Sequence, residues 1–391
     1  MSRLDTLVVH GGRDDFDAVG VHAPPVDRST TYPLSSLTLG TEDIDELAAG
    51  GHPRSSSVYA RLHNPTVARW ERAIAALENA DEAVAFGSGM AAVTAALFAA
   101  GASGRHVVAI RPVYGGTDHL LSSGLLGTRT TWARPDGVAA AIEADTALVV
   151  METPSNPTLA LVDIAAVVEQ AGEVPVLVDN TFATPILQRP LDHGATWALH
   201  SATKALGGHG DVVAGVIASD EERARVLRQV RIGTGAVLDP QAAYLLHRSL
   251  PTLALRVRAA QDNASELAKR LDGRAGVARV SHPSLPSCDP DGILGRQMDG
   301  PGSILTIDME GGLHVAGRVM ETVELITPAV SLGSTDTLIE HPAGLTHRVV
   351  DAEAQASSGI TPGLLRLSIG IEDVDDIWED LDRAIAAAMT S

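Results

Sequence analysis

The segment that decides the fold class reads Val174-Pro175-Val176-Leu177-Val178-Asp179-Asn180-Thr181. Its apolar body predicts a buried strand, and that strand ends in an aspartate. In open α/β sheets a side chain at the carboxyl end of a strand points into the crevice where ligands bind. Taken alone, Asp179 fits a helix N-cap or a turn residue equally well.

Short apolar runs and helical patterns alternate on both sides of this strand. Strands are expected at residues 83–86, 106–110, 147–151, 197–201 and 212–217. Helices are expected at residues 66–80, 91–100, around 118, and 164–171. Such alternation is typical of a mostly parallel sheet that is covered on both faces, so the predicted fold class is α/β.

The pattern changes at both ends of the chain. Beyond about residue 245 we predict a long helix at 242–271 with a break at Pro251, strands of a smaller sheet at 303–307 and 363–369, and an amphipathic helix at 373–389. The first 51 residues are rich in Gly, Pro, Ser and Thr without sustained periodicity. We therefore expect an extended N-terminal arm (1–51) that wraps a partner subunit, a large α/β domain (52–245) and a smaller α+β domain (246–391).

Composition excludes several classes of function. The chain has 391 residues and a net charge of −20, which argues against binding to nucleic acid because that requires a basic surface. Its one cysteine, Cys288, permits no internal disulfide, and the histidines show no spacing of a metal site. No apolar run approaches the roughly 20 residues of a membrane helix, and no signal peptide is apparent. We expect a cytoplasmic protein without a metal or a membrane partner.

A lysine among small and hydroxyl residues is the first candidate for chemistry. The segment reads His200-Ser201-Ala202-Thr203-Lys204-Ala205-Leu206-Gly207-Gly208 and follows an apolar strand. A desolvated lysine at this place has a lowered pKa, which suits Schiff-base chemistry, and the hydroxyls of Ser201 and Thr203 could donate to a phosphate. Taken alone, the segment also fits an ordinary exposed lysine in a turn.

A second candidate lies between a strand and a helix, at Phe86-Gly87-Ser88-Gly89-Met90-Ala91. Small residues here let backbone N–H groups approach an anion, and the positive end of the helix dipole favours negative charge. A plain tight turn explains the same residues.

Taken together with further motifs, these segments resemble the Cys/Met metabolism (transsulfuration) family of enzymes that depend on pyridoxal phosphate. The resemblance runs in order along nearly the whole chain. Its further motifs are Tyr59-Ala60-Arg61-Leu62-His63-Asn64-Pro65-Thr66, Tyr114-Gly115-Gly116-Thr117, Glu152-Thr153-Pro154-Ser155-Asn156-Pro157, Ser331-Leu332-Gly333, Leu345-Thr346-His347 and Arg366-Leu367-Ser368-Ile369-Gly370. The family implies the type I fold of aspartate aminotransferase, a pyridoxal 5'-phosphate cofactor and an amino-acid substrate.

The resemblance also implies roles for individual residues. It makes Lys204 the lysine that binds the cofactor and then moves protons, and Asp179 the partner of the pyridinium nitrogen. The implied phosphate site consists of Ser88, Gly89, Met90, Ser201 and Thr203, completed by Tyr59 and Arg61 of a neighbouring subunit. Tyr114 would stack on the cofactor and act as acid and base at the leaving group. Arg366, Ser331 and Asn156 resemble the site for the substrate carboxylate. The family is usually a homotetramer, a dimer of dimers whose active sites lie at the dimer interface.

Two positions favour a substrate with an uncharged tail. Family members that handle cystathionine often carry a carboxylate just before the Tyr-x-Arg and Ser-Leu-Gly motifs, where this chain has Val58 and Val330. A charged tail buried against valines would be costly. Gly116 departs from the pattern, because many methionine γ-lyases have a cysteine there, and its absence is expected to enlarge the pocket.

The expected reaction is γ-elimination of a sulfur amino acid. Local matches favour the methionine γ-lyase branch of the family, which converts L-methionine into methanethiol, 2-oxobutyrate and ammonia. Cystathionine γ-lyase remains an alternative, as does a cystathionine γ-synthase that replaces the γ-acyloxy group of an activated homoserine. A binding protein on a retained enzyme fold is a further alternative, against which the presence of Lys204, Asp179, Tyr114 and Arg366 argues.

Overall fold

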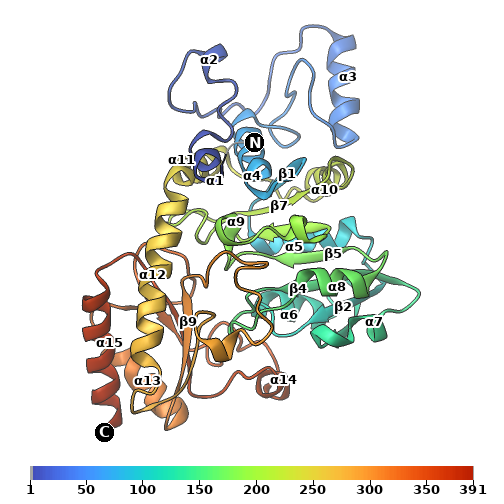
Figure 1. The fold of residues 1–391 in the computed structure, drawn as a ribbon. Helices are drawn as coiled ribbons and strands as arrows, with labels where there is room; N and C mark the ends of the chain where they lie inside the picture. Colours follow the sequence, from blue (N-terminus) through green and yellow to red (C-terminus); the bar gives the residue numbers. More distant parts are fainter. Residues whose placement is uncertain (1–2, 391) are drawn as a thin grey trace.

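The computed structural model describes residues 3–390, in which two sheets are joined by a long helix (Figure 1). The larger sheet has the strand order β1-β7-β6-β5-β4-β2-β3. Its strands are β1 (Glu82–Phe86), β2 (His106–Ile110), β3 (Arg129–Ala133), β4 (Thr146–Glu152), β5 (Val176–Asp179), β6 (Trp197–His200) and β7 (Gly215–Ser219). Neighbouring strands are parallel except that β7 runs antiparallel to β1 and β6. The predicted mostly parallel sheet is therefore confirmed.

Helices cover both faces of this sheet. One face packs on α5 (Gly89–Ala99), α6 (Gly115–Ser122) and α10 (Glu221–Thr234), and the other on α4 (Pro65–Glu78), α7 (Val138–Ala141), α8 (Ile164–Ala171) and α9 (Thr184–Leu187). Side chains alternate between the faces, so Leu177 lies in the core under α5 while Val176 and Val178 lie in the core under α8. Asp179 follows Val178 and therefore shares the face of α5.

The smaller sheet has the strand order β10-β11-β12-β9-β8. Its strands are β8 (Val277–Ser281), β9 (Ile304–Met309), β10 (Thr327–Pro328), β11 (Leu338–Glu340) and β12 (Leu364–Ser368). It is accompanied by α13 (Gly312–Thr322), α14 (Ala352–Ser357) and α15 (Val374–Met389). The strands predicted at 303–307 and 363–369 correspond to β9 and β12, and the final predicted helix corresponds to α15.

One helix belongs to the cores of both sheets. α12 (Leu253–Leu271) begins with Leu253 in the core of the larger sheet and ends with Leu271 in the core of the smaller one. Before it, α11 (Pro240–Ser249) is followed by a single turn of 3₁₀ helix around Pro251, where the break was predicted. No helix of residues 3–390 is long and apolar enough to cross a membrane. We keep the boundaries near residues 51 and 245 as our proposal for the division of the chain.

The N-terminal arm differs from its prediction as an extended segment. It contains the helices α1 (Leu4–His10), α2 (Phe16–Val19) and α3 (Leu37–Ala48), which lie above the larger sheet in Figure 1. The helix α3 starts where the Ser36 hydroxyl accepts a hydrogen bond from the Leu39 N–H at 3.1 Å. Leu37 is 85% exposed, so the apolar residues of α3 do not form the buried stripe by which a helix is recognised in sequence.

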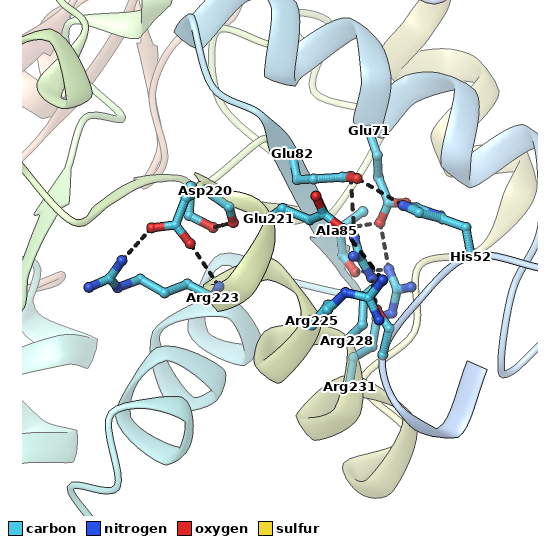
Figure 2. Close-up of polar contacts among 12 residues, drawn as sticks. His52, Glu71, Glu82, Ala85, Asp220, Glu221, Arg223, Arg225, Arg228 and Arg231 are labelled. Atoms are coloured by element: carbon cyan, nitrogen blue, oxygen red, sulfur yellow. Dashed lines mark hydrogen bonds and ion pairs between the residues drawn. The ribbon is translucent and has the colours of Figure 1, made fainter. Parts of the chain in front are cut away.

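A cluster of charges fastens this arm to the larger sheet (Figure 2). Three arginines of α10 lie at three-residue spacing and meet carboxylates or a carbonyl from the arm, α4 and β1. The contacts are Arg225–Glu46 (3.1 Å), Arg228–Gly50 O (2.5 Å), Arg228–Glu82 (3.3 Å) and Arg231–Glu71 (2.5 Å), and Glu82 also contacts His52 (3.0 Å). We call these residues the arm-anchoring cluster.

Candidate active site

A cavity of about 450 Å³ lies where the two sheets meet. The larger sheet contributes the carboxyl ends of β4, β5 and β6 and the first turn of α5, and the smaller sheet contributes β12 and the loops around residues 331 and 346. Its lining includes Ser88, Gly89, Met90, Tyr114, Glu152, Asn156, Asp179, Ser201, Thr203, Lys204, Val330, Ser331, Thr346 and Arg366. Most of the residues that the sequence singled out thus share one cavity, although they come from segments far apart in the chain.

Lys204 follows β6 and is the amine of this cavity. Its Nζ donates a hydrogen bond to the Ser331 hydroxyl at 2.6 Å. Burial lowers the pKa of Lys204 to about 8, and the nearby Arg366 guanidinium acts in the same direction, whereas Glu340 and Asp179 raise it. A larger fraction of this amine is therefore uncharged near neutral pH than of an exposed lysine, as a nucleophile or base requires.

Asp179 ends β5 and is held by Thr181. The Thr181 N–H and hydroxyl both donate to Oδ1 of Asp179, at 3.0 Å and 2.5 Å. Burial raises the pKa of Asp179, and the hydrogen bonds from Thr181 oppose that shift. Because both bonds are made to Oδ1, the second oxygen is available to a cationic N–H group in the cavity.

The first residue of α5, Gly89, lies very close to Ser201, which follows β6. A Cβ on Gly89 would lie 2.9 Å from Cβ of Ser201, so only glycine lets the helix N-terminus come this near to Ser201. Ser88 caps the helix by accepting from the Ala91 N–H at 3.0 Å. The backbone N–H groups of the first turn and the Ser201 hydroxyl together suit an anion such as a phosphate. Thr203 lines the cavity too, but its hydroxyl is bonded to the backbone of Ala214.

Arg366 lies on β12 and is almost fully buried. Its Nη1 donates to Asn156 Oδ1 at 2.8 Å and its Nη2 to the Ser331 carbonyl at 2.8 Å, and Nη2 also contacts Glu340 at 2.6 Å. Its buried Nε has no partner among the described residues. A buried donor without a partner is costly, so this N–H group marks a place for an acceptor from a ligand.

Ser331 connects the two cations of the cavity. Its hydroxyl accepts from Lys204 and its carbonyl accepts from Arg366. It adopts a φ of 85°, a left-handed conformation that costs a non-glycine residue about 1–3 kcal/mol. Strain of this kind persists where the surrounding structure requires it, and here it aims both polar groups of one residue at Lys204 and Arg366.

Tyr114 stands at the start of α6 and is 40% exposed. Its N–H donates to the carboxyl of Glu152 at 2.7 Å. A Cβ on Gly116 would lie 2.7 Å from the Tyr114 ring and 3.1 Å from the Met90 sulfur. The space beside Gly116 is therefore filled by the ring and the sulfur, which differs from the enlarged pocket that we expected from the absence of a cysteine.

Four predicted residues are absent from the cavity lining of their own chain, namely Gly116, Val58, Tyr59 and Arg61. Val58, Tyr59 and Arg61 lie in the segment between the arm and α4. Arg61 instead donates to the Ile232 carbonyl at 2.7 Å, and Tyr59 is 45% exposed. Of the two valines used to predict substrate preference, Val330 lines the cavity and Val58 does not.

Two buried carboxyl groups were missed by the sequence analysis, Glu152 in the cavity lining and Glu340 behind it in contact with Arg366. Glu152 ends β4 directly beside Asp179 on β5, so the signal that identified Asp179 could also have identified Glu152. Burial and the Asp179 charge hold the pKa of Glu152 well above its ordinary value. Glu340 has no such signal, because it reaches the cavity only through its pairing with Arg366 between β11 and β12.

The sequence of this chain is similar to those of known enzymes. The sequence profile of the Cys/Met metabolism PLP-dependent enzymes matches residues 5–386. An L-methionine γ-lyase of Brevibacterium aurantiacum is 53% identical over 387 residues, which cover 98% of this chain and 94% of that protein.

Solved structures agree along the whole chain. A cystathionine γ-lyase from Lactobacillus plantarum, complexed with L-serine, matches with a TM-score of 0.91 and 32% identity, covering 99% of this chain and 100% of the other. A cystathionine γ-synthase from Xanthomonas oryzae pv. oryzae, in complex with aminoacrylate and cysteine, matches with a TM-score of 0.91 and 34% identity, covering 100% and 99%. Both neighbours share the architecture described above, with lower sequence identity than the methionine γ-lyase.

Proposed function

This chain belongs to the Cys/Met metabolism family of PLP-dependent enzymes, and we propose that it eliminates the γ-substituent of L-methionine. The products are methanethiol, 2-oxobutyrate and ammonia, and one water is consumed. The observation that carries the proposal is the single cavity that gathers Lys204, Asp179 and Arg366 beside the apolar Val330. The 53% identity to an L-methionine γ-lyase over nearly the full length supports the same substrate.

The residues of the cavity fit pyridoxal phosphate. The close approach of Gly89 to Ser201 leaves backbone N–H groups for a phosphate, and Asp179 can accept from a pyridinium N–H group. Lys204 can attach through its amine to the aldehyde carbon. When bound, the cofactor supplies an electron sink conjugated to the amine of the substrate, which stabilises negative charge on the substrate carbons.

Arg366 binds the carboxylate of the amino acid in this proposal. Its unpartnered Nε supplies a donor, and Asn156 and Ser331 hold the guanidinium plane in place. The free Nε–H group can donate one charge-assisted hydrogen bond to the carboxylate, and the contacts that hold the guanidinium determine where that carboxylate is bound.

Two side chains move protons. With cofactor and substrate bound, the Lys204 amine would take the proton from the α carbon, and its pKa near 8 suits a base that works close to neutral pH. Tyr114 then gives a proton to the sulfur as the bond to the γ carbon breaks, so that a neutral thiol leaves. The contact of its backbone with Glu152 fixes the loop that carries this ring.

Substrate preference rests on the apolar lining. Val330 is 52% exposed at the cavity, and Val58 is proposed to join it from a partner subunit. The distal ammonium and carboxylate of cystathionine would be desolvated there without charged partners, whereas the thioether of methionine carries no charge.

We also propose that the chain works in the cytoplasm as a homotetramer, a dimer of dimers. Tyr59 and Arg61 lie outside their own cavity, which is consistent with their reaching the phosphate of a neighbouring subunit. Mixing inactive K204A and R61A subunits tests this arrangement, because a mixed dimer regains one site with both residues intact. Absence of any recovered activity would contradict shared sites.

A competition experiment tests the proposed substrate. The cofactor-loaded protein receives equal L-methionine and L-cystathionine, and mass spectrometry identifies the thiols released. We expect mainly methanethiol. Mainly cysteine would instead favour a cystathionine γ-lyase, and neither thiol would favour the γ-replacement reaction suggested by the likeness to a cystathionine γ-synthase.

A further inference from the structure

Glu340 has no role in the proposed reaction, although it is the carboxylate in contact with Arg366. It ends β11 directly opposite Arg366 on β12 in the antiparallel register. Glu340 is 1% exposed and Arg366 is 2% exposed, and their Oε1 and Nη2 atoms lie 2.6 Å apart. Pairing between strands therefore brings a carboxyl group against the residue that recognises the substrate carboxylate.

The contacts of Glu340 fix the position of its carboxyl group. Oε1 accepts from Arg366 and also from the Thr346 hydroxyl at 2.9 Å, whereas Oε2 is buried without a partner among the described residues. Thr346 itself lines the cavity. A single oxygen of Glu340 thus holds Nη2 of Arg366, whereas Asn156 holds Nη1.

Three acceptors then fix the orientation of the guanidinium. Asn156 binds Nη1, whereas the Ser331 carbonyl and Glu340 both bind Nη2. With Nη2 occupied, Nε remains as the buried donor without a partner. The direction in which Arg366 presents its free donor is therefore set by what holds Nη2.

We propose that Glu340 is a positioning residue, which orients Arg366 through Oε1 so that the guanidinium recognises the α-carboxylate of an amino acid. The position of the acceptor oxygen matters in this role, and its charge does not. The inference rests on the proposed function only in that the cavity accepts an α-amino acid.

Two substitutions separate position from charge. Glu340→Gln keeps an oxygen at the same distance along the side chain and removes the charge. Glu340→Asp keeps the charge and withdraws the oxygen by one methylene, about 1.5 Å. Both variants are smaller changes than truncation to alanine, which would leave Arg366 unpaired in the interior.

The experiment compares two probes that differ only in a carboxylate. L-Norleucine resembles methionine but has no thiolate to release, and n-pentylamine is the same molecule without the carboxylate. Calorimetry gives the Kd of each probe with the cofactor-loaded wild type, E340Q and E340D. A merely structural role of Glu340 would not change the affinities of the two probes differently.

The expected result is selective. E340D should raise the Kd of L-norleucine at least about tenfold, because a displaced charged hydrogen bond frees the guanidinium to turn. E340Q should bind L-norleucine no more than about threefold more weakly than the wild type, since the acceptor is retained. Binding of n-pentylamine should be equal in all three proteins.

Other outcomes overturn the proposal. If E340Q weakens L-norleucine and E340D does not, the charge acts rather than the position. If neither variant changes the ratio of the two Kd values, or if both probes weaken in parallel, Glu340 does not position Arg366. A wild type that prefers L-norleucine to n-pentylamine but releases no thiol from methionine would contradict the proposed function while leaving this inference intact.

Discussion

The arm-anchoring cluster and the cavity both bury arginines against carboxylates, yet the charges are balanced in only one of them. In the arm-anchoring cluster each buried arginine has its own glutamate, Arg231 with Glu71 and Arg228 with Glu82. Burial alone would raise the pKa of Glu82, but His52 and Arg228 outweigh it and lower that pKa. Burial lowers the pKa of Arg228, and the charges of Glu82 and Glu71 oppose that shift, so each buried charge of this cluster faces an opposite charge within the chain.

The cavity behaves in the opposite way. Burial raises the pKa of Asp179, Glu152 and Glu340 and lowers that of Lys204. Here three carboxyl groups and one amine are displaced together toward the neutral form, so the cavity lacks sufficient charged partners in the chain itself. A buried cluster whose charges compensate one another holds segments of the chain together. A buried cluster whose charges are not compensated indicates where the charged groups of a cofactor and a substrate bind.

The largest expected effect is at Lys204. The chain has only two lysines, so Lys204→Ala has a matched control in Lys269→Ala, on the exposed side of α12. We expect K204A to lose thiol release and the visible absorbance of the attached cofactor, because no other amine lies in the cavity lining. K269A should retain both. Turnover or cofactor absorbance that survives in K204A would refute the assignment of Lys204.

Substitutions in the arm-anchoring cluster should lower the free energy of unfolding. Arg231→Ala leaves the buried Glu71 without its arginine, so the free energy of unfolding should fall by about 3–5 kcal/mol. Arg225→Ala on the same helix is the control, since its partly exposed pair with Glu46 should contribute only about 0–1 kcal/mol. Urea denaturation of the two variants measures the difference. Equal losses would show that the compensated pair is not the source of the stabilisation.

The lowered pKa of Lys204 predicts a pH dependence in the protein freed of cofactor. Below pH 8 the amine is mostly charged, so its labelling by an amine-reactive reagent should fall about tenfold per pH unit. Labelling of Lys269 in the same sample is the internal reference, and peptide mass spectrometry measures both.

The same pKa determines how stability changes with pH. The unfolded chain binds this proton up to its ordinary pKa of 10.5, whereas the folded chain releases it near 8. Between these values the unfolded state holds more protons, so the contribution of Lys204 to stability rises with pH. A Lys204 labelling midpoint near 10.5 would contradict the buried environment of the amine.

The smallest effect is expected at Glu152. Its pKa is held well above the ordinary value, so Glu152→Gln removes little charge and keeps an acceptor for the Tyr114 N–H. We expect kcat/KM of E152Q to stay close to that of the wild type. The difference should correspond to about 1 kcal/mol or less of activation free energy. Steady-state kinetics measures this effect, and Glu71→Gln serves as the comparison. E71Q breaks a compensated pair, so it should lower the free energy of unfolding instead. A large loss of kcat in E152Q would show that the carboxyl acts as a charge.

Several parts of the molecule were predictable because their signals are local. The apolar run that ends at Asp179, the glycines before α5 and the break at Pro251 each depend on neighbours in the chain. The helices α3 and α10 were missed for a physical reason. α3 exposes Leu37 and Leu39, and α10 carries arginines whose partners come from α4, β1 and the arm, so neither shows a plain apolar stripe.

The sequence by itself determined the fold class, the family, the cofactor and most of the residues that share the cavity with Lys204, because motifs in fixed order encode them. Only the tertiary structure decided which groups compensate one another. Glu340 meets Arg366 through strand register, Ser331 faces both cations through a left-handed backbone, and the Tyr114 ring fills the space beside Gly116. Such contacts join segments distant in the chain, and their effect on charge depends on burial, which no local pattern of residues specifies.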